Sequence, residues 1–365
     1  MSFYVVNILI FLIYAGLLKQ KRSLGKKTAK YIIILSGIHF GLIMCFRGFR
    51  VGVDTLMYSG IYGRVASQEN IVSVINSFPK YAGYAVICKV FSFFIPNSYG
   101  YMIMTGLLII PIVWWFIYHY SNNVILSIYL YITFFFYCSS FNVSREFIAI
   151  SLGLIIYYCI DRGRLIPSIV LFFISISIHS VSLVLLLLFV FKFLKMSRKS
   201  LLLTVGISVS AIFLFDRLTS VFIRYFPQYA FYDLGGAHAY SSSRWTSNGG
   251  IIIFYLIYLA VGLLGMYICE RKQYDYLKTK NTFRMSILLL CAALLGLIFP
   301  RNQLVSRIVF YFSIYVIILI PNSLNFFKKS NKKKLKMAIY IIMMIPLIYL
   351  LYTNNSGVVP YSLFI

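Results

Sequence analysis

The sequence predicts an all-α integral membrane protein that crosses the bilayer many times. Of its 365 residues, 61% are hydrophobic and only 12% are charged, whereas a soluble domain carries about 25% charged and about 45–50% apolar residues. Apolar runs of about 20 residues, the length of a membrane-spanning helix, recur along the whole chain. This composition excludes a water-soluble globule. We expect about 12 membrane helices in a single transmembrane domain, residues 1–365.

Ten apolar runs are candidates for membrane helices. The first 18 residues carry no charge, and a basic cluster follows them. A signal peptide carries its positive charge in front of its apolar region, so we expect an uncleaved first span with its N-terminus outside. The ten runs are 2–18, 30–46, 101–118, 124–141, 143–160, 201–215, 250–269, 285–299, 308–327 and 337–353.

Basic segments between the runs give the orientation. Five of them hold 23 of the 34 Lys and Arg residues, and most of these 23 are lysines. Positively charged loops of membrane proteins stay in the cytoplasm, so we expect all five on that side. The segments are 19–30, 161–165, 192–200, 270–284 and 328–336.

Two apolar stretches do not fit simple alternation across the membrane. Residues 167–191 have cytoplasmic charge on both flanks, so a single span would place one flank outside. A broken, re-entrant hairpin with His179 at its apex satisfies both flanks. Residues 81–95 are also apolar but contain Lys89. Given the predicted sides of the spans before and after them, these residues must cross the membrane an even number of times. We therefore expect an interfacial or re-entrant helix there, on the outer side.

The remaining eleven cations fall on the predicted outer side, and nine of them are arginines. Arginine forms bidentate hydrogen bonds to phosphate and carboxylate groups, which favours an anion site that faces outward. Alternatively, these side chains reach lipid headgroups or pair with five acidic residues of the same side. The cations are Arg47, Arg50, Arg64, Lys80, Lys89, Arg145, Arg217, Arg224, Arg244, Arg301 and Arg307, and the acids are Asp54, Glu69, Glu146, Asp216 and Asp233.

The first candidate site follows the second span, in residues 46–58. Arg47 and Arg50 leave the membrane together, and Asp54 and Tyr58 follow them. Asp54 has two interpretations. It balances an arginine or caps a helix, or it orients or deprotonates a substrate hydroxyl group.

The second candidate site opens the run at 143–160. Asn142 and Arg145 are three residues apart and would share one helix face. An arginine at a helix N-terminus favours anion binding. The alternative is that Asn142 caps the helix and that Arg145 pairs with Glu146.

His179 lies between Ser177 and Ser180 in an apolar run. A histidine in such a run is either a hydrogen-bonded structural residue or, at membrane depth, a functional group. Its ordinary pKa is near neutral, which suits acid–base catalysis.

Two more outer segments contribute candidates. Arg301 to Arg307 forms a short predicted loop, and Tyr311 lies one turn beyond Arg307 on the same face. The long polar segment 216–249 carries Arg224 and Arg244 among aromatic residues. Such rings either stack on sugars or form an interfacial belt. We expect the loops 47–100 and 216–249 to form the extracytoplasmic substrate face.

Several chemistries lack their motifs. The chain has no G-x-x-x-x-G-K-[ST], no H-E-x-x-H and no G-x-S-x-G, so ATP hydrolysis, metalloprotease and serine hydrolase activities are not expected. The six cysteines are scattered without a C-x-x-C, and the outer side has no paired carboxylates. We therefore expect no cofactor, no metal and no nucleic-acid partner.

Four blocks in order resemble the EpsG family of Wzy-type polysaccharide polymerases. They are FRGFRVGVDTLMY, FNVSREFIA, SISIHS and RIVFY, and they span residues 46–311. The resemblance implies a metal-independent, GT-C-like glycosyltransferase of the bacterial cytoplasmic (inner) membrane with an outward-facing active site. Such an enzyme joins undecaprenyl-pyrophosphate-linked repeat units into capsule, exopolysaccharide or O-antigen. Its implied partners are these lipid-linked glycans, membrane lipids, a chain-length regulator and a flippase.

The resemblance also implies roles for residues. His179 or Asp54 would be the base, and Arg145 and Arg307 would bind the donor pyrophosphate. Arg47 and Arg50 would lie nearby or bind the acceptor's pyrophosphate. Two departures are Glu146, where the family often has Gln, and Tyr81-Ala82-Gly83-Tyr84, which lacks the family's acidic residue. The substrate-binding candidates are Arg47, Arg50, Tyr58, Asn142, Arg224, Arg244, Arg301 and Tyr311.

Three other functions stay open at this point. An O-antigen ligase-like transferase would use the same chemistry on another acceptor. A lipid-linked oligosaccharide flippase or transporter would favour inverted repeats, and we find no repeat. A membrane-bound acyltransferase would use the intramembrane histidine and leave the glycan length unchanged.

Overall fold

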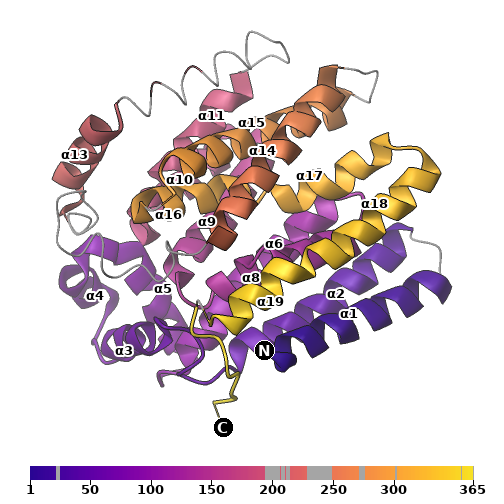
Figure 1. Cartoon of the computed structure of the whole chain (residues 1–365). Helices are drawn as coiled ribbons and strands as arrows, with labels where there is room; N and C mark the ends of the chain where they lie inside the picture. The colour runs from indigo at the N-terminus through magenta and orange to yellow at the C-terminus, as the bar shows by residue number, and fades with distance from the viewer. Residues whose placement is uncertain are drawn as a thin grey trace. The chain divides into compact units, whose positions relative to one another are not determined.

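The computed structural model is helical throughout the residues that it describes (Figure 1). These are 1–21, 25–193, 206, 210, 214–227, 249–270, 276–300, 302–354 and 356–364. Within them, the one isolated β-bridge joins Arg47 to Leu363. Most of the predicted span 201–215, residues 228–248 of the segment 216–249, and the candidates Arg244 and Arg301 lie outside the described residues.

Seven of the described helices are long and apolar enough to cross a membrane, which confirms a polytopic all-α membrane protein. Their outward faces carry exposed apolar side chains such as Ile13, Ile38 and Ile345, as expected of surfaces that meet lipid. The seven are Ser2–Gln20, Lys26–Cys45, Gly100–Tyr120, Ile252–Glu270, Lys280–Ile298, Leu304–Phe326 and Lys329–Tyr352. The expected total of about 12 membrane helices stays a prediction.

The chain divides into two compact units, Met1–Leu183 with Met337–Ile365, and Val184–Lys336. In the first unit, α2 packs along α6, α6 against α9, and α9 against α10. Trp114 Nε1 on α6 donates a 2.8 Å hydrogen bond to Ser36 Oγ on α2, so the buried indole N–H is satisfied. The helices are α1 Ser2–Lys21, α2 Lys26–Cys45, α3 Thr55–Ala66, α4 Ile71–Ser77, α5 Ala82–Ser92, α6 Gly100–Tyr120, α7 Val124–Thr133, α8 Phe136–Ser139, α9 Ser144–Asp161, α10 Leu165–Ile178 and α19 Met344–Tyr352. Helix α18, Lys329–Ile342, begins in the second unit and ends in the first.

In the second unit, α14 and α15 pack closely along each other. A Cβ atom on Gly262 or Gly265 would lie under 3.0 Å from Leu290 or Ser286, so only glycine allows this approach. The helices of this unit are α11 Leu186–Phe193, α13 Phe215–Tyr225, α14 Gly249–Glu270, α15 Tyr276–Ile298, α16 Gln303–Ser313 and α17 Val316–Ser323.

The predicted break at His179 is confirmed. Helix α10 ends at Ile178, His179 is extended (φ −149°, ψ 111°), and a 3₁₀-helix, Ser180–Leu185, leads into α11. The predicted run 81–95 contains α5, which has 11 residues and a length of about 16 Å. It is too short to cross a hydrocarbon core of about 30 Å, as expected for a helix that does not span.

Two predictions about element boundaries were wrong. The run 124–141 is not one helix, because α7 ends at Thr133 and Phe135 adopts a left-handed conformation (φ 67°) before α8. This run is uniformly apolar and has neither Gly nor Pro, so its sequence carries no signal for the break. The basic segments 270–284 and 328–336 are not simple loops either, since α15 begins at Tyr276 and α18 at Lys329.

The C-terminal segment returns along the loop that follows α2. Gly48 N donates to Ser362 O (2.7 Å), Gly52 N to Gly357 O (2.9 Å) and Phe364 N to Phe46 O (3.2 Å). Tyr361 also donates from its hydroxyl group to Ile43 O at 2.8 Å. The tail therefore supplies the hydrogen-bond partners of a loop that has no helix or sheet of its own.

This pairing leads to a test with two glycines. A Cβ atom at Gly48 would lie 2.5 Å from Ser362 Oγ and 3.2 Å from Leu363 O, whereas one at Gly60 would meet nothing within 4 Å. We expect Gly48→Ala to destabilise the protein by about 1–3 kcal/mol through overpacking. Gly60→Ala, inside α3, should be neutral or stabilising. Thermal unfolding of the purified variants measures both effects. Equal melting temperatures would contradict the inference that the C-terminal tail holds this loop in place.

Candidate functional site

The loop 46–54 carries the first candidate residues and delivers them to the start of α3. Gly52 has φ +101°, and a Cβ atom there would lie 2.7 Å from Thr55 Oγ1 and 2.9 Å from Asn142 Oδ1. Thr55 Oγ1 in turn donates to Val51 O at 2.7 Å. Only glycine tolerates both this conformation and this crowding. The turn therefore fixes Asp54, which is half-buried and directly precedes α3.

Asp54 occupies the N-cap position of α3, but its carboxylate makes no capping hydrogen bond. Tyr58 follows it by one helical turn, with Tyr58 N donating to Asp54 O at 3.0 Å. The capping interpretation of Asp54 is therefore wrong. Its side chain shares an edge of α3 with Tyr58.

Asn142 does not share a helix face with Arg145, because α9 begins only at Ser144. Instead, Asn142 Nδ2 donates to Ser356 O at 2.8 Å, and Asn142 Oδ1 accepts a longer bond (3.5 Å) from Asp54 N. The side chain is 4% exposed. Asn142 thus links the loop before α3 to the C-terminal tail.

Arg145, in the first turn of α9, is surrounded by tyrosine rings. Its guanidinium carbon lies 4.7 Å from the ring centre of Tyr81, 5.3 Å from that of Tyr58 and 5.7 Å from that of Tyr84. Its Nε also donates to the Tyr58 hydroxyl group at 3.4 Å. Each ring attracts the cation through its π face. We call Tyr58, Tyr81 and Tyr84 the tyrosine cage.

The cage rests on a second layer of side chains. Tyr58 stacks on Tyr101 of α6 with ring centres 5.6 Å apart, and the Tyr101 hydroxyl group is hydrogen-bonded to Ser144, the neighbour of Arg145. Tyr84 is fully buried, and desolvation raises the pKa of its phenol well above the usual range. The Tyr84 ring therefore stays uncharged beside the guanidinium.

Sequence reasoning missed Tyr81 and Tyr84 as site residues. The signal was nevertheless present, because both residues belong to Tyr81-Ala82-Gly83-Tyr84, the tetrapeptide that lacks the acidic residue implied by the resemblance. Where the family often carries an acidic residue, this chain places the ring of Tyr81 over Arg145.

A contact between two helices brings the neighbourhood of His179 to that of the tyrosine cage. Helix α5 packs against α10, and a Cβ atom on Gly83 would lie under 3.0 Å from Ser177 Oγ. Tyr84 comes directly after Gly83 on α5, and His179 comes two residues after Ser177 of α10. Both residues therefore lie next to the point where these two helices touch. His179 is 4% exposed, and its carbonyl accepts from Ser182 N (2.9 Å) and Oγ (2.7 Å), which fixes the break.

The two arginines of the loop 46–54 have different environments. Arg47 is completely buried, donates from Nη1 to Met44 O at 2.6 Å, and lies 4.7 Å from the ring centre of Phe141. Arg50 is exposed. Of the pair that was expected to act together, only Arg50 is accessible to a ligand from solution.

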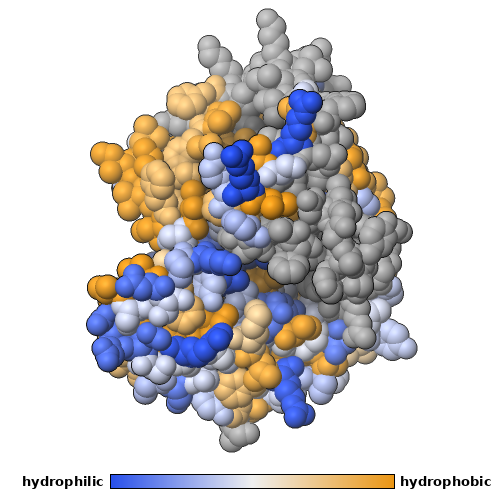
Figure 2. All heavy atoms as spheres, turned by 90° about the vertical axis from the view of Figure 1, so that its left-hand side faces the viewer, coloured by the Kyte–Doolittle hydropathy of each residue, from blue (hydrophilic) through white to orange (hydrophobic). Residues whose placement is uncertain are grey.

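Lys89, another predicted outer cation, is also buried, at 5% exposure. Its Nζ donates to Ala66 O (3.1 Å) and to Gln68 O, the carbonyls at the end of α3. It therefore caps that helix end and stabilises its dipole. Arg64, Glu69 and Lys80 are exposed. Figure 2 shows hydrophilic side chains gathered in the lower half of the face that it draws, where α3 and α4 lie.

Arg307 and Tyr311 belong to the second unit, and both lie in α16. The expected loop from Arg301 to Arg307 was wrong, because Asn302 Oδ1 accepts from Val305 N at 3.0 Å and starts the helix at Gln303. Arg307 is half-buried and Tyr311 is 1% exposed. Arg224, also in this unit, is exposed at the end of α13.

No group of three or more His, Cys, Asp or Glu side chains within the described ranges could hold a metal ion. The described candidates include the guanidinium of Arg145, the carboxylate of Asp54 and the imidazole of His179.

Comparison with known proteins identifies the family. The family model described as EpsG family matches residues 30–363, which run from α2 to the C-terminal tail. No curated protein and no solved structure matches the chain at a significant level. Because the match covers nearly all of the 365 residues, including the loop 46–54, the cage and the break at His179, this protein belongs to the EpsG family.

Proposed function

We propose that this protein is a polysaccharide polymerase, a glycosyltransferase that joins undecaprenyl-pyrophosphate-linked repeat units. Membership of the EpsG family and the membrane-spanning helices support a role in polysaccharide biosynthesis. The observation that carries the proposal is the guanidinium of Arg145, held in the tyrosine cage at the start of α9. It is a built anion site of the kind that a pyrophosphate leaving group requires.

The reaction needs no separate energy source, because the donor is already activated. A hydroxyl oxygen of the acceptor sugar attacks the anomeric carbon of the donor, and the bond from that carbon to the pyrophosphate oxygen breaks. The lipid pyrophosphate leaves with the bonding electrons, and the hydroxyl proton passes to a base. Negative charge therefore grows on the pyrophosphate, which a fixed cation stabilises most in the transition state.

Arg145 has two properties that fit this role. It lies in the first turn of an 18-residue helix, whose N-terminal N–H groups add positive potential at the same place. Its cage is made of aromatic rings, whose π faces attract the cation without adding a formal charge of their own. A carboxylate in the position of Tyr81 would compete with the pyrophosphate.

The other candidates take roles around this centre. His179 is our choice for the base, with Asp54 as its competitor. We also assign Arg307 to the donor pyrophosphate, as the resemblance implies, and Arg50 to the acceptor's pyrophosphate. Arg224, Arg244, Arg301 and Tyr311 would contact the glycan or its pyrophosphate. Arg47 and Asn142 would position the loop that presents Asp54.

The setting is also part of the proposal. The enzyme would work without a metal on the outer face of the bacterial cytoplasmic membrane, with its N-terminus outside and a GT-C-like arrangement of about 12 membrane helices. Its product would pass to a chain-length regulator, and a flippase would supply its substrate.

Substitution of the two central residues tests the proposal. We expect Arg145→Ala to cost about 2.7–4 kcal/mol of transition-state stabilisation, or about 100- to 1000-fold in rate. His179→Ala should likewise abolish chain extension. Gel analysis of lipid-linked glycans would then show single repeat units without a polymer ladder.

The matched control is Arg162→Ala. Arg162 follows the other end of α9 and also lies over a tyrosine, with 5.5 Å from its guanidinium carbon to the ring centre of Tyr158. It should give a normal ladder at normal membrane expression. A normal ladder from both Arg145→Ala and His179→Ala would refute the site.

The tyrosine cage gives a separate prediction. Tyr81→Phe keeps the aromatic ring and should keep activity, whereas Tyr81→Leu keeps only the bulk. A cation–π contact is worth about 0.5–2 kcal/mol, so Tyr81→Leu should slow polymerisation by about 2- to 30-fold. Initial rates with a lipid-linked repeat unit measure this. Equal rates for the phenylalanine and leucine variants would show that ring electrostatics does not matter.

A further inference from the structure

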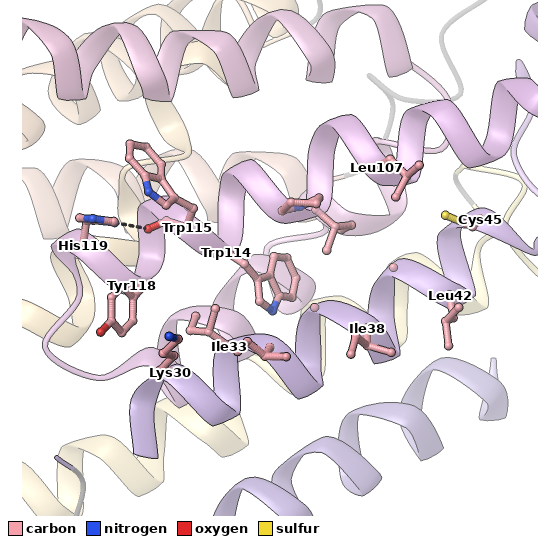
Figure 3. A pocket seen from close by; sticks show the side chains of 16 residues that line it. Lys30, Ile33, Ile38, Leu42, Cys45, Leu107, Trp114, Trp115, Tyr118 and His119 are labelled. Carbon is pink, nitrogen blue, oxygen red and sulfur yellow. Dashed lines mark hydrogen bonds between the residues drawn. The ribbon is translucent and has the colours of Figure 1, made fainter. Parts of the chain in front are cut away.

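An apolar groove of about 650 Å³ lies between α2 and α6 (Figure 3). Ile38 and Leu42 line it from α2, and Leu107 and Trp114 line it from α6. Ile38, Leu42 and Leu107 are about half exposed on the outer surface of these two helices. The groove therefore opens toward the surroundings of two membrane-spanning helices, where lipid chains compete for it.

Glycines create the groove. A Cβ atom on Gly106 would lie under 3.0 Å from Cys45 Sγ, so the helices touch at that end. At Gly37 and Gly41 the nearest atoms to such a Cβ are 3.6 Å and 4.0 Å away. These two glycines are thus not required for close helix packing. Their missing side chains leave the space that forms the groove floor.

Polar groups occur at one end only. Lys30, Tyr118 and His119 lie together there, and Cys45 lies at the other end (Figure 3). His119 Nδ1 is hydrogen-bonded to Trp115 O at 2.8 Å. Between these ends the walls are hydrocarbon and indole, which suits a flexible apolar chain.

The groove is long for a phospholipid tail. The 15 helical steps from Lys30 to Cys45 correspond to about 22 Å of helix. The hydrocarbon core of a bilayer is about 30 Å thick, and one leaflet supplies about half of it. An occupant that fills the groove therefore extends beyond the tail of one leaflet's phospholipid.

The Cys45 end of the groove lies next to the candidate site along the chain. Cys45 is followed by Phe46 and the loop that carries Arg50 and Asp54. On the opposite wall, Gly106 lies five residues after Tyr101, about 7.5 Å along α6, and the ring of Tyr101 supports the tyrosine cage. The Cys45 end of the groove therefore lies at the same end of α2 and α6 as the loop 46–54 and Tyr101.

We propose that this groove binds the polyprenyl tail of the lipid-linked substrate whose pyrophosphate is held at Arg145. The inference rests on the proposed function for the identity of the headgroup. The length, the apolar walls and the connection to the site favour a long isoprenoid chain over a phospholipid. The groove then makes the enzyme selective for the length of the carrier lipid.

Filling the groove tests this inference. Gly41→Leu places a side chain where the nearest atom is 4.0 Å from the Cβ position. Gly37→Leu is a second variant of the same kind. Gly16→Leu is the matched control, because Gly16 is exposed on α1 with nothing within 4 Å of its Cβ position.

The probe is undecaprenyl phosphate with a photoreactive diazirine in its tail, added to the purified protein. We expect labelling of α2 and α6 peptides in the wild type and in Gly16→Leu. Labelling should fall about tenfold or more in Gly41→Leu and Gly37→Leu, since each methylene group displaced from an apolar site is worth roughly fourfold in binding. The KM for an undecaprenyl-linked donor should rise in parallel, while that for a short-tailed donor should not change.

The outcomes separate the two proposals. Undiminished labelling in both filled variants would overturn the groove assignment, as would displacement of the probe from wild-type protein by phosphatidylglycerol. Failure of the wild type to extend any lipid-linked glycan would instead overturn the proposed function, because labelling does not depend on catalysis.

Discussion

The candidate site depends on how non-helical backbone finds hydrogen-bond partners. A helix satisfies its own N–H and C=O groups, and in a membrane protein any segment that leaves the helical conformation must be satisfied elsewhere. The loop 46–54 takes its partners from the C-terminal tail, through Gly48, Gly52 and Val53. The break at His179 takes its partners from Ser175 and Ser182. The reactive groups lie where helices stop, and these hydrogen bonds hold them there.

The outer cations illustrate how differently one charge can be used. Lys89 donates hydrogen bonds to the carbonyls at the end of α3, and Arg47 is buried against aromatic rings. Arg145 lies over three tyrosine rings at the start of a helix, and Arg50 is exposed. A surplus of positive charge therefore overstates the number of groups that can meet an anionic ligand. What distinguishes Arg145 is its position over three aromatic rings in the first turn of α9.

Most of the architecture could be predicted from the sequence, because the length of an apolar run and the charge of a loop are local signals. The long spans, the break at His179 and the family followed from such signals. The left-handed Phe135 did not, because its surroundings are uniformly apolar. The tyrosine cage and the tail contacts join residues far apart in the chain, and no local pattern encodes which tyrosine faces Arg145. Arg307 was misplaced because the N-cap at Asn302 lies inside a stretch that looks like a loop.

The pairing of the tail with the loop 46–54 also sets an order of events during synthesis. Ser362 is translated more than 300 residues after Gly48, its hydrogen-bond partner, which corresponds to about 15–60 s at 5–20 residues per second. Throughout that interval the loop's amide groups must be hydrated or paired otherwise. The loop can take its final shape only after the helices between the two partners have been made. Assembly of the candidate site is therefore a late step of biogenesis.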